Sequence, residues 1–353
     1  MSNFGRLSKM AAENTNKVRS SSLWRLDMRE TQENLSAIIA ESALRWDIPE
    51  GVSARLLSHS ENAVFLLSHG DWKRVLRIHR MNYHSASAIR SELDWMAALT
   101  RDKGIETPIA LPGTDGQLIQ YIAPAAGEKE RFVVLFDFIS GREPQVEDME
   151  AAFGHLGAMA ATMHNHAREW ERPAYFERMV WDYENSLGSN PNWGGWEPGF
   201  AGSQSDIEVV RQADRLMKEQ LAAYGTGPDR FGLIHSDLRS ANLLIEDGKT
   251  KILDFDDCGI GWFLYDLASA LSFQENHERA DAIIAAWVAG YRTVAPLPDE
   301  ELSIVPTLML LRRLIVMGWA GSHPETELAH HMRESGYTAG TVTLAQRYLQ
   351  NNS

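Results

Sequence analysis

The amino-acid sequence predicts an α+β protein with two lobes, a small antiparallel β lobe followed by a mainly helical lobe. Its 353 residues are long enough to build two hydrophobic cores. Short apolar runs separated by turn residues fill residues 52–79, a pattern typical of an antiparallel meander. After residue 145 the apolar residues recur mainly at helical spacing, which indicates a helical second half.

The first lobe is expected to span residues 31–140. Residues 1–30 are polar and have no clear period, so we expect a flexible leader. A helix should then run from residue 31 to just before Pro49. The sheet and its helix are expected at residues 52–58, 63–68, 72–79, 85–100 (helix), 118–122 and 131–138.

The second lobe is expected to span residues 141–353, because Gly141 and Pro144 interrupt the pattern there. Its helices are expected at residues 146–168, 206–224, 267–273, 280–291, 301–319 and 337–349. Three histidines of the first helix do not have the spacing of a metal site. The Trp-rich stretch 181–196 either packs a loop onto a helix or surrounds a cationic amine, and the sequence leaves both open.

The chemistry-bearing segment is residues 233–257, LIHSDLRSANLLIEDGKTKILDFDD. Two short apolar runs flank an Asp-Gly pair, which predicts a hairpin. The hairpin should bring Asn242 and Asp254 side by side, with Asp237 on the same loop. Carboxylate and amide oxygens suit Mg²⁺, so Asn242 and Asp254 are the expected metal ligands. Asp237 is the expected acceptor of a proton from an attacking hydroxyl.

The motif H-x-D-L-x-x-x-N followed by Asp-Phe resembles the catalytic segment of the protein-kinase-like superfamily. The later stretch Tyr265-Asp266-Leu267-Ala268 makes it more similar to the aminoglycoside phosphotransferase and choline kinase branch, which includes type II homoserine kinases. The resemblance covers about residues 50–350. It implies a two-lobed kinase-like fold and ATP with Mg²⁺ as cofactors. Asp256 either adds a metal contact or is solvated.

The resemblance also implies a set of nucleotide-binding residues. Arg77 stands where the family usually has a phosphate-binding Lys, and Glu92 on the next helix is its expected partner. The turn containing Ser60 and Asn62 lies where kinases cover the phosphates, although it lacks glycine and an ordinary hairpin loop explains it equally well. The backbone from Asp137 to Gly141, including Ile139, resembles the hinge that binds adenine.

The segment after Asp254 argues against a regulated protein kinase. Only twelve residues separate Asp254 from Asp266, and there is no A-P-E motif. By resemblance, Asp266 is expected to cap the next helix and to brace the catalytic loop. One of the adjacent Arg312 and Arg313 is expected to face the cleft and to hold an acceptor carboxylate.

Composition limits the partners and the cellular location that the sequence predicts. A net charge of −14 argues against nucleic acid as a partner. A single cysteine indicates a reducing compartment, and the apolar stretch 304–320 is expected to be too short for a bilayer and contains two arginines. We therefore expect a cytoplasmic protein that does not bind membranes, as a monomer or homodimer.

The resulting hypothesis is an ATP-dependent phosphotransferase. It would move the γ-phosphoryl group to a hydroxyl of a small amino alcohol or hydroxy amino acid, such as choline, ethanolamine or homoserine. Two alternatives remain at this point: a Ser/Thr protein kinase of the same superfamily, and an inactive nucleotide-binding protein.

Overall fold

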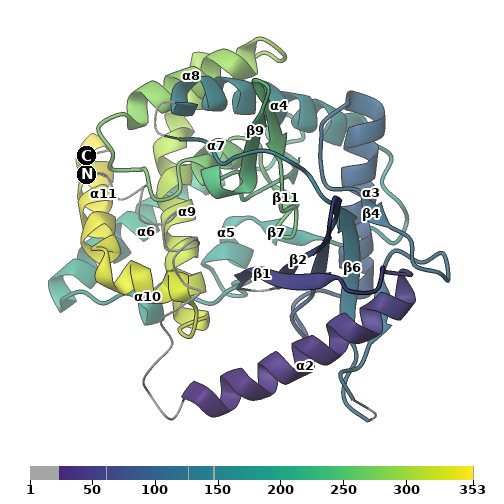
Figure 1. Ribbon diagram of the computed structural model, residues 1–353. Coiled ribbons are helices and arrows are strands. Elements are labelled where there is room, and N and C mark those ends of the chain that lie inside the picture. The colour runs from purple at the N-terminus through teal and green to yellow at the C-terminus, as the bar shows by residue number, and fades with distance from the viewer. Residues whose placement is uncertain (1–23, 61, 126, 146–147, 353) are drawn as a thin grey trace. The chain divides into compact units, whose positions relative to one another are not determined.

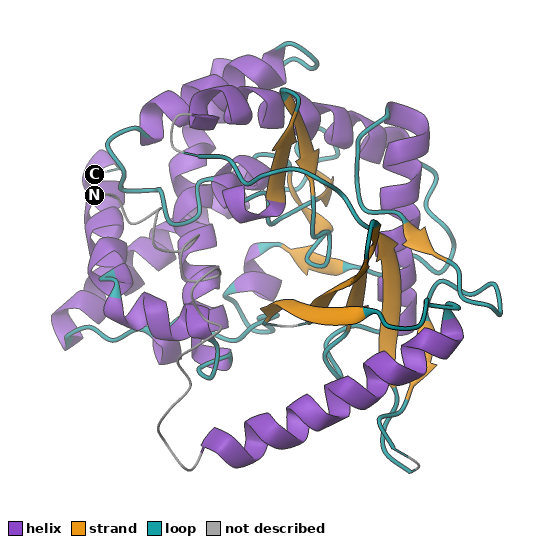
Figure 2. Cartoon of the chain, in the orientation of Figure 1, coloured by secondary structure: helices purple, strands orange, loops and turns teal. Residues whose placement is uncertain are grey.

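The computed structural model describes residues 24–60, 62–125, 127–145 and 148–352. They form two compact units. The first contains the described residues up to Leu93 together with Pro108–Ile139, and the second contains Asp94–Thr107, Ser140–Pro144 and the chain from Asp148 on. Strands dominate the first unit and helices the second, which confirms the α+β prediction (Figure 2).

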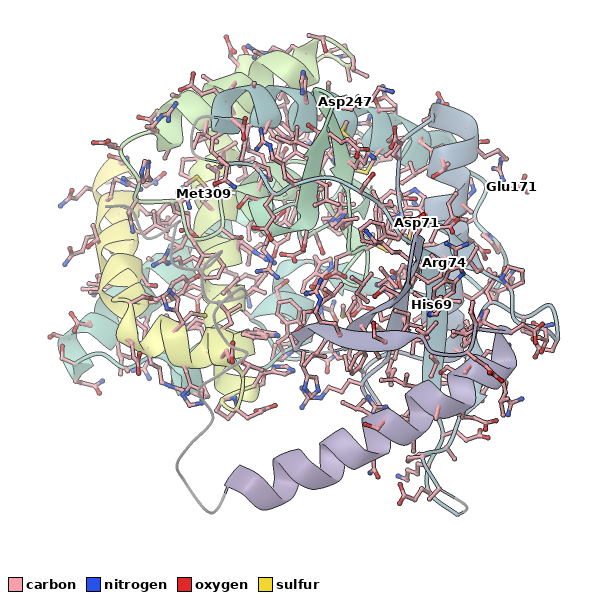
Figure 3. The ribbon with its side chains drawn as sticks, viewed as in Figure 1. His69, Asp71, Arg74, Glu171, Asp247 and Met309 are labelled. Atoms are coloured by element: carbon pink, nitrogen blue, oxygen red, sulfur yellow. The ribbon has the colours of Figure 1, made fainter. Side chains whose placement is uncertain are left out.

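The first unit is built on one antiparallel sheet. Its strand order is β1-β2-β3-β6-β4, with β5 also paired to β6. Their bounds are β1 Ser53–His59, β2 Ala63–His69, β3 Trp72–Ile78, β4 Ala110–Leu111, β5 Gln120–Ile122 and β6 Arg131–Asp137. The three meander strands thus lie within a residue of their predicted limits. Figure 3 labels His69, the last residue of β2, and Asp71, which lies in the tight turn between β2 and β3.

Helix α2, Trp24–Arg45, lies alongside this sheet (Figure 1). Its residues Leu35 and Ile38 belong to the same buried core as Phe65 and Leu76 of the sheet. The helix begins earlier than predicted, so residues 24–30 are helical rather than part of a leader. Residues 1–23 of the expected leader lie outside the described part of the chain. The next helix, α3, spans Ala86–Lys103.

The second unit is mainly helical. Its helices are α4 Met149–Glu169, α5 Tyr183–Ser186, α6 Gln204–Tyr224, α7 Tyr265–Ala270, α8 Ala280–Arg292, α9 Val305–Ser322, α10 Glu327–Glu334 and α11 Tyr337–Asn351, with short 3₁₀ turns η2 Glu197–Gly199, η3 Ser240–Asn242 and η4 Asp299–Ile304. Glycines allow α4 and α8 to approach closely. A Cβ added to Gly290 would lie 1.8 Å from the Gly154 carbonyl oxygen, so this contact needs a residue without a side chain.

Helix α9 is the central apolar element of the second unit. Together with η4 it is long and apolar enough to cross a membrane by length and composition, so the prediction that this stretch is too short is wrong. However, 83% of its apolar window is buried inside the protein, as expected of a core helix. Figure 3 labels Met309, which is 6% exposed, on this helix.

Two small sheets complete the second unit and flank residues 235–242, the expected catalytic loop. Strands β9 (Leu243–Glu246) and β10 (Lys249–Ile252) form an antiparallel hairpin. Strand β11 (Gly259–Trp262) lies between β7 (Met179–Trp181), to which it is parallel, and β8 (Phe231–Ile234), to which it is antiparallel. The catalytic loop follows β8 directly.

Candidate active site

The predicted hairpin forms and aligns the two expected metal ligands. Asp247 and Gly248 at its tip have φ angles of 50° and 74°, the left-handed values that a two-residue hairpin turn requires. Figure 3 labels Asp247 at this tip. At the other end, the Leu253 N–H donates to the Asn242 carbonyl at 2.8 Å. Asn242 and the residue preceding Asp254 are therefore hydrogen-bonded neighbours, as the spacing predicted.

Asp237 is buried, with 7% of its surface exposed, and its carboxylate accepts three hydrogen bonds. Oδ2 accepts from Asn242 Nδ2 at 2.7 Å and from Arg239 Nε at 3.1 Å. Oδ1 accepts from the Arg312 guanidinium. Burial alone would raise the pKa of Asp237, but the charges of Arg239 and Arg312 outweigh it and lower the pKa to about 2. The group is therefore ionised at every physiological pH.

Arg239 and Arg312 are site residues that sequence analysis did not assign to Asp237. Arg239 is two residues beyond Asp237 in the motif, so its proximity was open to inference from the spacing. Arg312 is 75 residues away in α9, and no local pattern points to the contact. The Arg239 side chain is about one-third exposed, whereas Arg312 is 4% exposed.

The geometry of Asn242 fits a hard cation. Its Nδ2 group donates both to the Asp237 carboxylate and to the Asp237 carbonyl, at 2.7 and 2.9 Å, which leaves the amide oxygen turned away from Asp237. That oxygen has no hydrogen-bond partner among the described residues. Asp254 is solvent-exposed and has a left-handed φ of 57°. One amide oxygen and one carboxylate are a donor set that suits Mg²⁺ completed by phosphate oxygens and water.

Asp256 occupies a different environment from Asp254. It is 5% exposed, and its carbonyl accepts from the Arg178 guanidinium, which also donates through Nε to the Cys258 carbonyl at 2.6 Å. The structure thus places Asp256 in the protein interior, which removes the solvated alternative. Among the described residues, no group of three or more His, Cys, Asp or Glu side chains gathers as a metal site.

Asp266 braces the catalytic loop, as the resemblance implied. Its Oδ1 accepts from the Ser236 N–H at 2.7 Å, and its Oδ2 accepts from the His235 N–H at 3.2 Å. Ser236 has a left-handed φ of 66°, a conformation that costs free energy and that these bonds help to hold. Asp266 also binds His164 Nε2 at 2.9 Å. It does not cap its helix: the N-cap of α7 is Leu264, which makes no side-chain cap bond.

A buried strand replaces the activation segment of protein kinases. Gly259 and Gly261 lie in β11, and a Cβ on either would come within about 3 Å of Trp181 atoms. The glycines therefore let the indole of Trp181 pack on this strand. Trp181, Trp193 and Trp196 are 1%, 8% and 4% exposed, so packing explains most of their surface.

The Arg77–Glu92 pair expected in the first unit is present. The guanidinium binds the carboxylate through two bonds of 2.8 Å, from Nη1 to Oε1 and from Nη2 to Oε2. The two side chains are 7% and 0% exposed. Arg77 also donates from Nε to His79 Nε2 at 3.2 Å and lies 5.0 Å from the ring centre of Phe136. This fork geometry is one that Arg offers and Lys does not.

The other residues expected to contact the nucleotide differ in exposure and in whether they already have a hydrogen-bond partner within the protein. Ser60 is exposed, whereas Asn62 is 6% exposed and its Oδ1 accepts from the Arg80 N–H at 3.2 Å. The Asp137 N–H is engaged with the Ile109 carbonyl at 2.9 Å. By contrast, the Ile139 N–H has no hydrogen-bond partner within the described part of the chain.

Neither arginine of α9 is placed to hold an acceptor carboxylate. Arg312 is committed to Asp237, and Arg313 donates from Nη1 to Glu275 Oε2 at 2.6 Å and lies 3.6 Å from the ring centre of Tyr337. Both are buried, at 4% and 5% exposed. The expectation of an acceptor contact there is wrong because partners within the protein occupy both guanidinium groups.

Comparison with known proteins places the chain among small-molecule kinases. The solved structure of a microcompartment-associated aminopropanol kinase is 39% identical, covers 89% of this chain and 97% of that chain, and has a TM-score of 0.80. Amicoumacin kinase of Bacillus subtilis (strain 168) is 25% identical over 293 residues, 80% of this chain and 83% of the relative. The amicoumacin kinase hAmiN, solved in complex with AMP-PNP, Ca²⁺ and Ami, shares the fold, with 21% identity, coverage of 90% and 96%, and a TM-score of 0.74.

The family model of the phosphotransferase enzyme family, APH, matches residues 53–297. That range includes the Arg77–Glu92 pair and every residue of the catalytic segment. The chain therefore belongs to the phosphotransferase enzyme family and is an ATP-dependent small-molecule kinase.

Proposed function

We propose that the enzyme transfers the γ-phosphoryl group of ATP to the hydroxyl of a small amino alcohol, with aminopropanol as the first candidate. The observation that carries the proposal is the 39% identity, over 89% of the chain, to an aminopropanol kinase. Choline, ethanolamine and homoserine are acceptors of the same chemical kind and form the comparison set. The catalytic segment supports a hydroxyl acceptor whichever of these is correct.

Asp237 would receive the hydrogen bond of the attacking hydroxyl. With a pKa of about 2, its carboxylate is a weak base but a permanently charged acceptor. This is sufficient when the transition state is loose, because the hydroxyl proton then leaves only as the new P–O bond forms. The main contribution of Asp237 is thus orientation, and the proton passes to its carboxylate late in the reaction.

Asn242 and Asp254 would hold Mg²⁺, which neutralises charge on the ATP phosphates. The outward amide oxygen of Asn242 and the exposed carboxylate of Asp254 support this assignment. Asp256, which is buried two residues beyond Asp254, is the candidate for a second metal contact. Arg239, partly exposed beside Asp237, adds a cation where negative charge develops.

The first unit would bind the nucleotide, and the second would carry catalysis and acceptor binding. Arg77, fixed by Glu92, would contact the α- and β-phosphates. The Ile139 N–H, which has no hydrogen-bond partner among the described residues, and the Asp137 carbonyl would contact adenine. Ser60 remains the better candidate in the phosphate-covering turn, since the side-chain oxygen of Asn62 already binds Arg80. We place the enzyme in the cytoplasm, where ATP is available.

The test is ADP release with Mg-ATP and a panel of aminopropanol, ethanolamine, choline, homoserine and a sugar. We expect the highest kcat/KM with aminopropanol and loss of activity in Asp237→Ala. Asp229→Ala, an exposed aspartate outside the motif, is the matched control and should retain activity. If aminopropanol is no better than the sugar, the acceptor proposal fails. If Asp237→Ala stays active, the assignment of the catalytic residue fails.

A further inference from the structure

Two neighbouring arginines in the middle of α9 are buried to nearly the same degree but have different partners. Arg312 and Arg313 are 4% and 5% exposed, and each binds one carboxylate. The carboxylate of Arg313 is Glu275, which also belongs to the helical body of the second unit. The carboxylate of Arg312 is Asp237, in the catalytic loop. Only one of the two cations therefore reaches the reacting group.

Arg312 holds the catalytic loop at two points. Its Nη2 group donates to Asp237 Oδ1, and its Nη1 group approaches the Ser236 carbonyl at 3.4 Å. Ser236 has the left-handed φ of 66°, so Arg312 binds the strained residue as well as the carboxylate beside it. Its own orientation is fixed from the opposite side, because Nε donates to Ser272 Oγ at 2.9 Å. The guanidinium therefore lies between the turn that follows α7 and the catalytic loop, and it is hydrogen-bonded to both.

The hydrogen bonds to the Asp237 carboxylate leave one of its acceptor sites without a donor among the described residues. An ionised carboxylate has about four acceptor sites, two on each oxygen. Asn242 and Arg239 occupy both sites of Oδ2. Arg312 occupies one site of Oδ1, and no other donor to this oxygen is present among the described residues. The remaining acceptor site is therefore on Oδ1, the oxygen that Arg312 holds.

We propose that Arg312 is a positioning residue, which fixes the carboxylate of Asp237 so that the free acceptor site of Oδ1 receives the hydroxyl of the acceptor substrate. This inference rests on the proposed role of Asp237 in the reaction. Arg312 itself touches neither the substrate nor the transferred group. It determines which oxygen accepts the proton and in which direction that oxygen points.

Loss of the hydrogen bonds from Arg312 to the catalytic loop should slow phosphoryl transfer and leave nucleotide binding intact. Without Arg312 the carboxylate is held only through Oδ2, by Asn242 and Arg239, and both sites of Oδ1 become open to water. A displacement of about 1 Å at a reacting group lowers rates by about 100-fold. We therefore expect kcat for the alcohol to fall by about 30- to 100-fold, with KM for ATP changed less than about threefold. Hydrolysis of ATP by water should fall less, because water reorients freely.

The experiment compares matched variants at the two arginines. Ser272→Ala removes the Nε partner of Arg312, and Thr341→Ala removes the Nε partner of Arg313, which donates to Thr341 Oγ1 at 3.0 Å. Arg312→Lys and Arg313→Lys keep the charge of each but lose the fork. For each protein, kcat, both KM values, the ratio of phosphoryl transfer to ATP hydrolysis, and the Tm are measured.

We expect Arg312→Lys, and to a smaller degree Ser272→Ala, to lower kcat and the ratio of transfer to hydrolysis. Thr341→Ala and Arg313→Lys should lower only the Tm. If the two sets of variants change the ratio equally, or if Arg312→Lys and Ser272→Ala leave kcat within threefold of the parent, the proposal is overturned. If Arg312→Lys does not fold, the Ser272→Ala and Thr341→Ala pair decides alone, since each removes a single hydroxyl.

Asp237→Ala separates this inference from the assignment on which it rests. If Asp237→Ala is inactive while the Arg312 and Ser272 variants are normal, the role of Asp237 stands and the positioning role of Arg312 fails. If Asp237→Ala retains activity, the catalytic assignment fails, and the inference about Arg312 fails with it.

Discussion

Variants of the Arg77–Glu92 pair should separate its contribution to stability from its contribution to nucleotide binding. Its two charge-assisted bonds of 2.8 Å join side chains that are 7% and 0% exposed. Removing either partner leaves a buried charge without its counterion, which costs about 3–5 kcal/mol. Replacing both with apolar residues of similar size is often nearly neutral. We therefore expect Arg77→Met and Glu92→Leu each to destabilise strongly, and the double variant to recover most of the loss.

The coupling free energy expected from this double-mutant cycle is about 3 kcal/mol or more. It is measured by urea unfolding, followed by far-UV circular dichroism and by tryptophan fluorescence. Because the chain has two compact units, free energies are compared only where the two signals give coincident transitions. A coupling below about 1 kcal/mol would contradict the interpretation of a desolvated ion pair. The double variant should be stable again but should bind ATP more weakly than the parent, because it lacks the Arg77 cation that is proposed to contact the phosphates.

Three further predictions concern the second unit. Asp254→Ala should lower kcat at least about 100-fold without moving the Tm, and activity above a few per cent would refute its role as metal ligand. Burial lowers the pKa of His164 below its usual 6.5 despite the bond to Asp266, so the unfolded chain binds more protons as the pH falls below 6.5. The urea midpoint should therefore decrease below pH 6.5, and His164→Gln should flatten that slope; an unchanged slope would exclude His164 as its source. Gly290→Ala, which places a Cβ 1.8 Å from a backbone oxygen of α4, should cost about 1–3 kcal/mol. Gly195→Ala, with nothing within 4 Å, should stay within about 0.5 kcal/mol of the parent, and equal Tm shifts in the two variants would contradict the packing argument.

Features encoded by short-range spacing were predictable from the sequence. The hairpin follows from Asp247-Gly248 between apolar runs, and it alone brings Asn242 beside Asp254. The Arg77–Glu92 pair follows from an inward position on a strand and another on the next helix. In both cases the partners are 15 residues apart or fewer, so local periodicity determines which side chains meet.

Features that depend on distant packing were not predictable in the same way. The contact between Arg312 and Asp237 joins residues 75 positions apart, and helical periodicity says only that Arg312 and Arg313 point in different directions. Asn62 was expected near phosphates because its turn lies where kinases cover the phosphates, and its side-chain oxygen accepts from the N–H of Arg80, two residues beyond β3. Strand β11 was not recognised because its four residues, two of them glycine, have low intrinsic β propensity.

The apolar character of α9 has a consequence for the newly made chain. By length and composition alone, Asp299–Ser322 is apolar enough to cross a membrane, although most of it is buried in the folded protein. Arg312 and Arg313 stand near its middle, where each charge opposes insertion by about 2.5–3.5 kcal/mol. Together they disfavour the membrane by about four orders of magnitude. Replacing both with Leu should therefore move nascent protein into the membrane fraction of a translation extract.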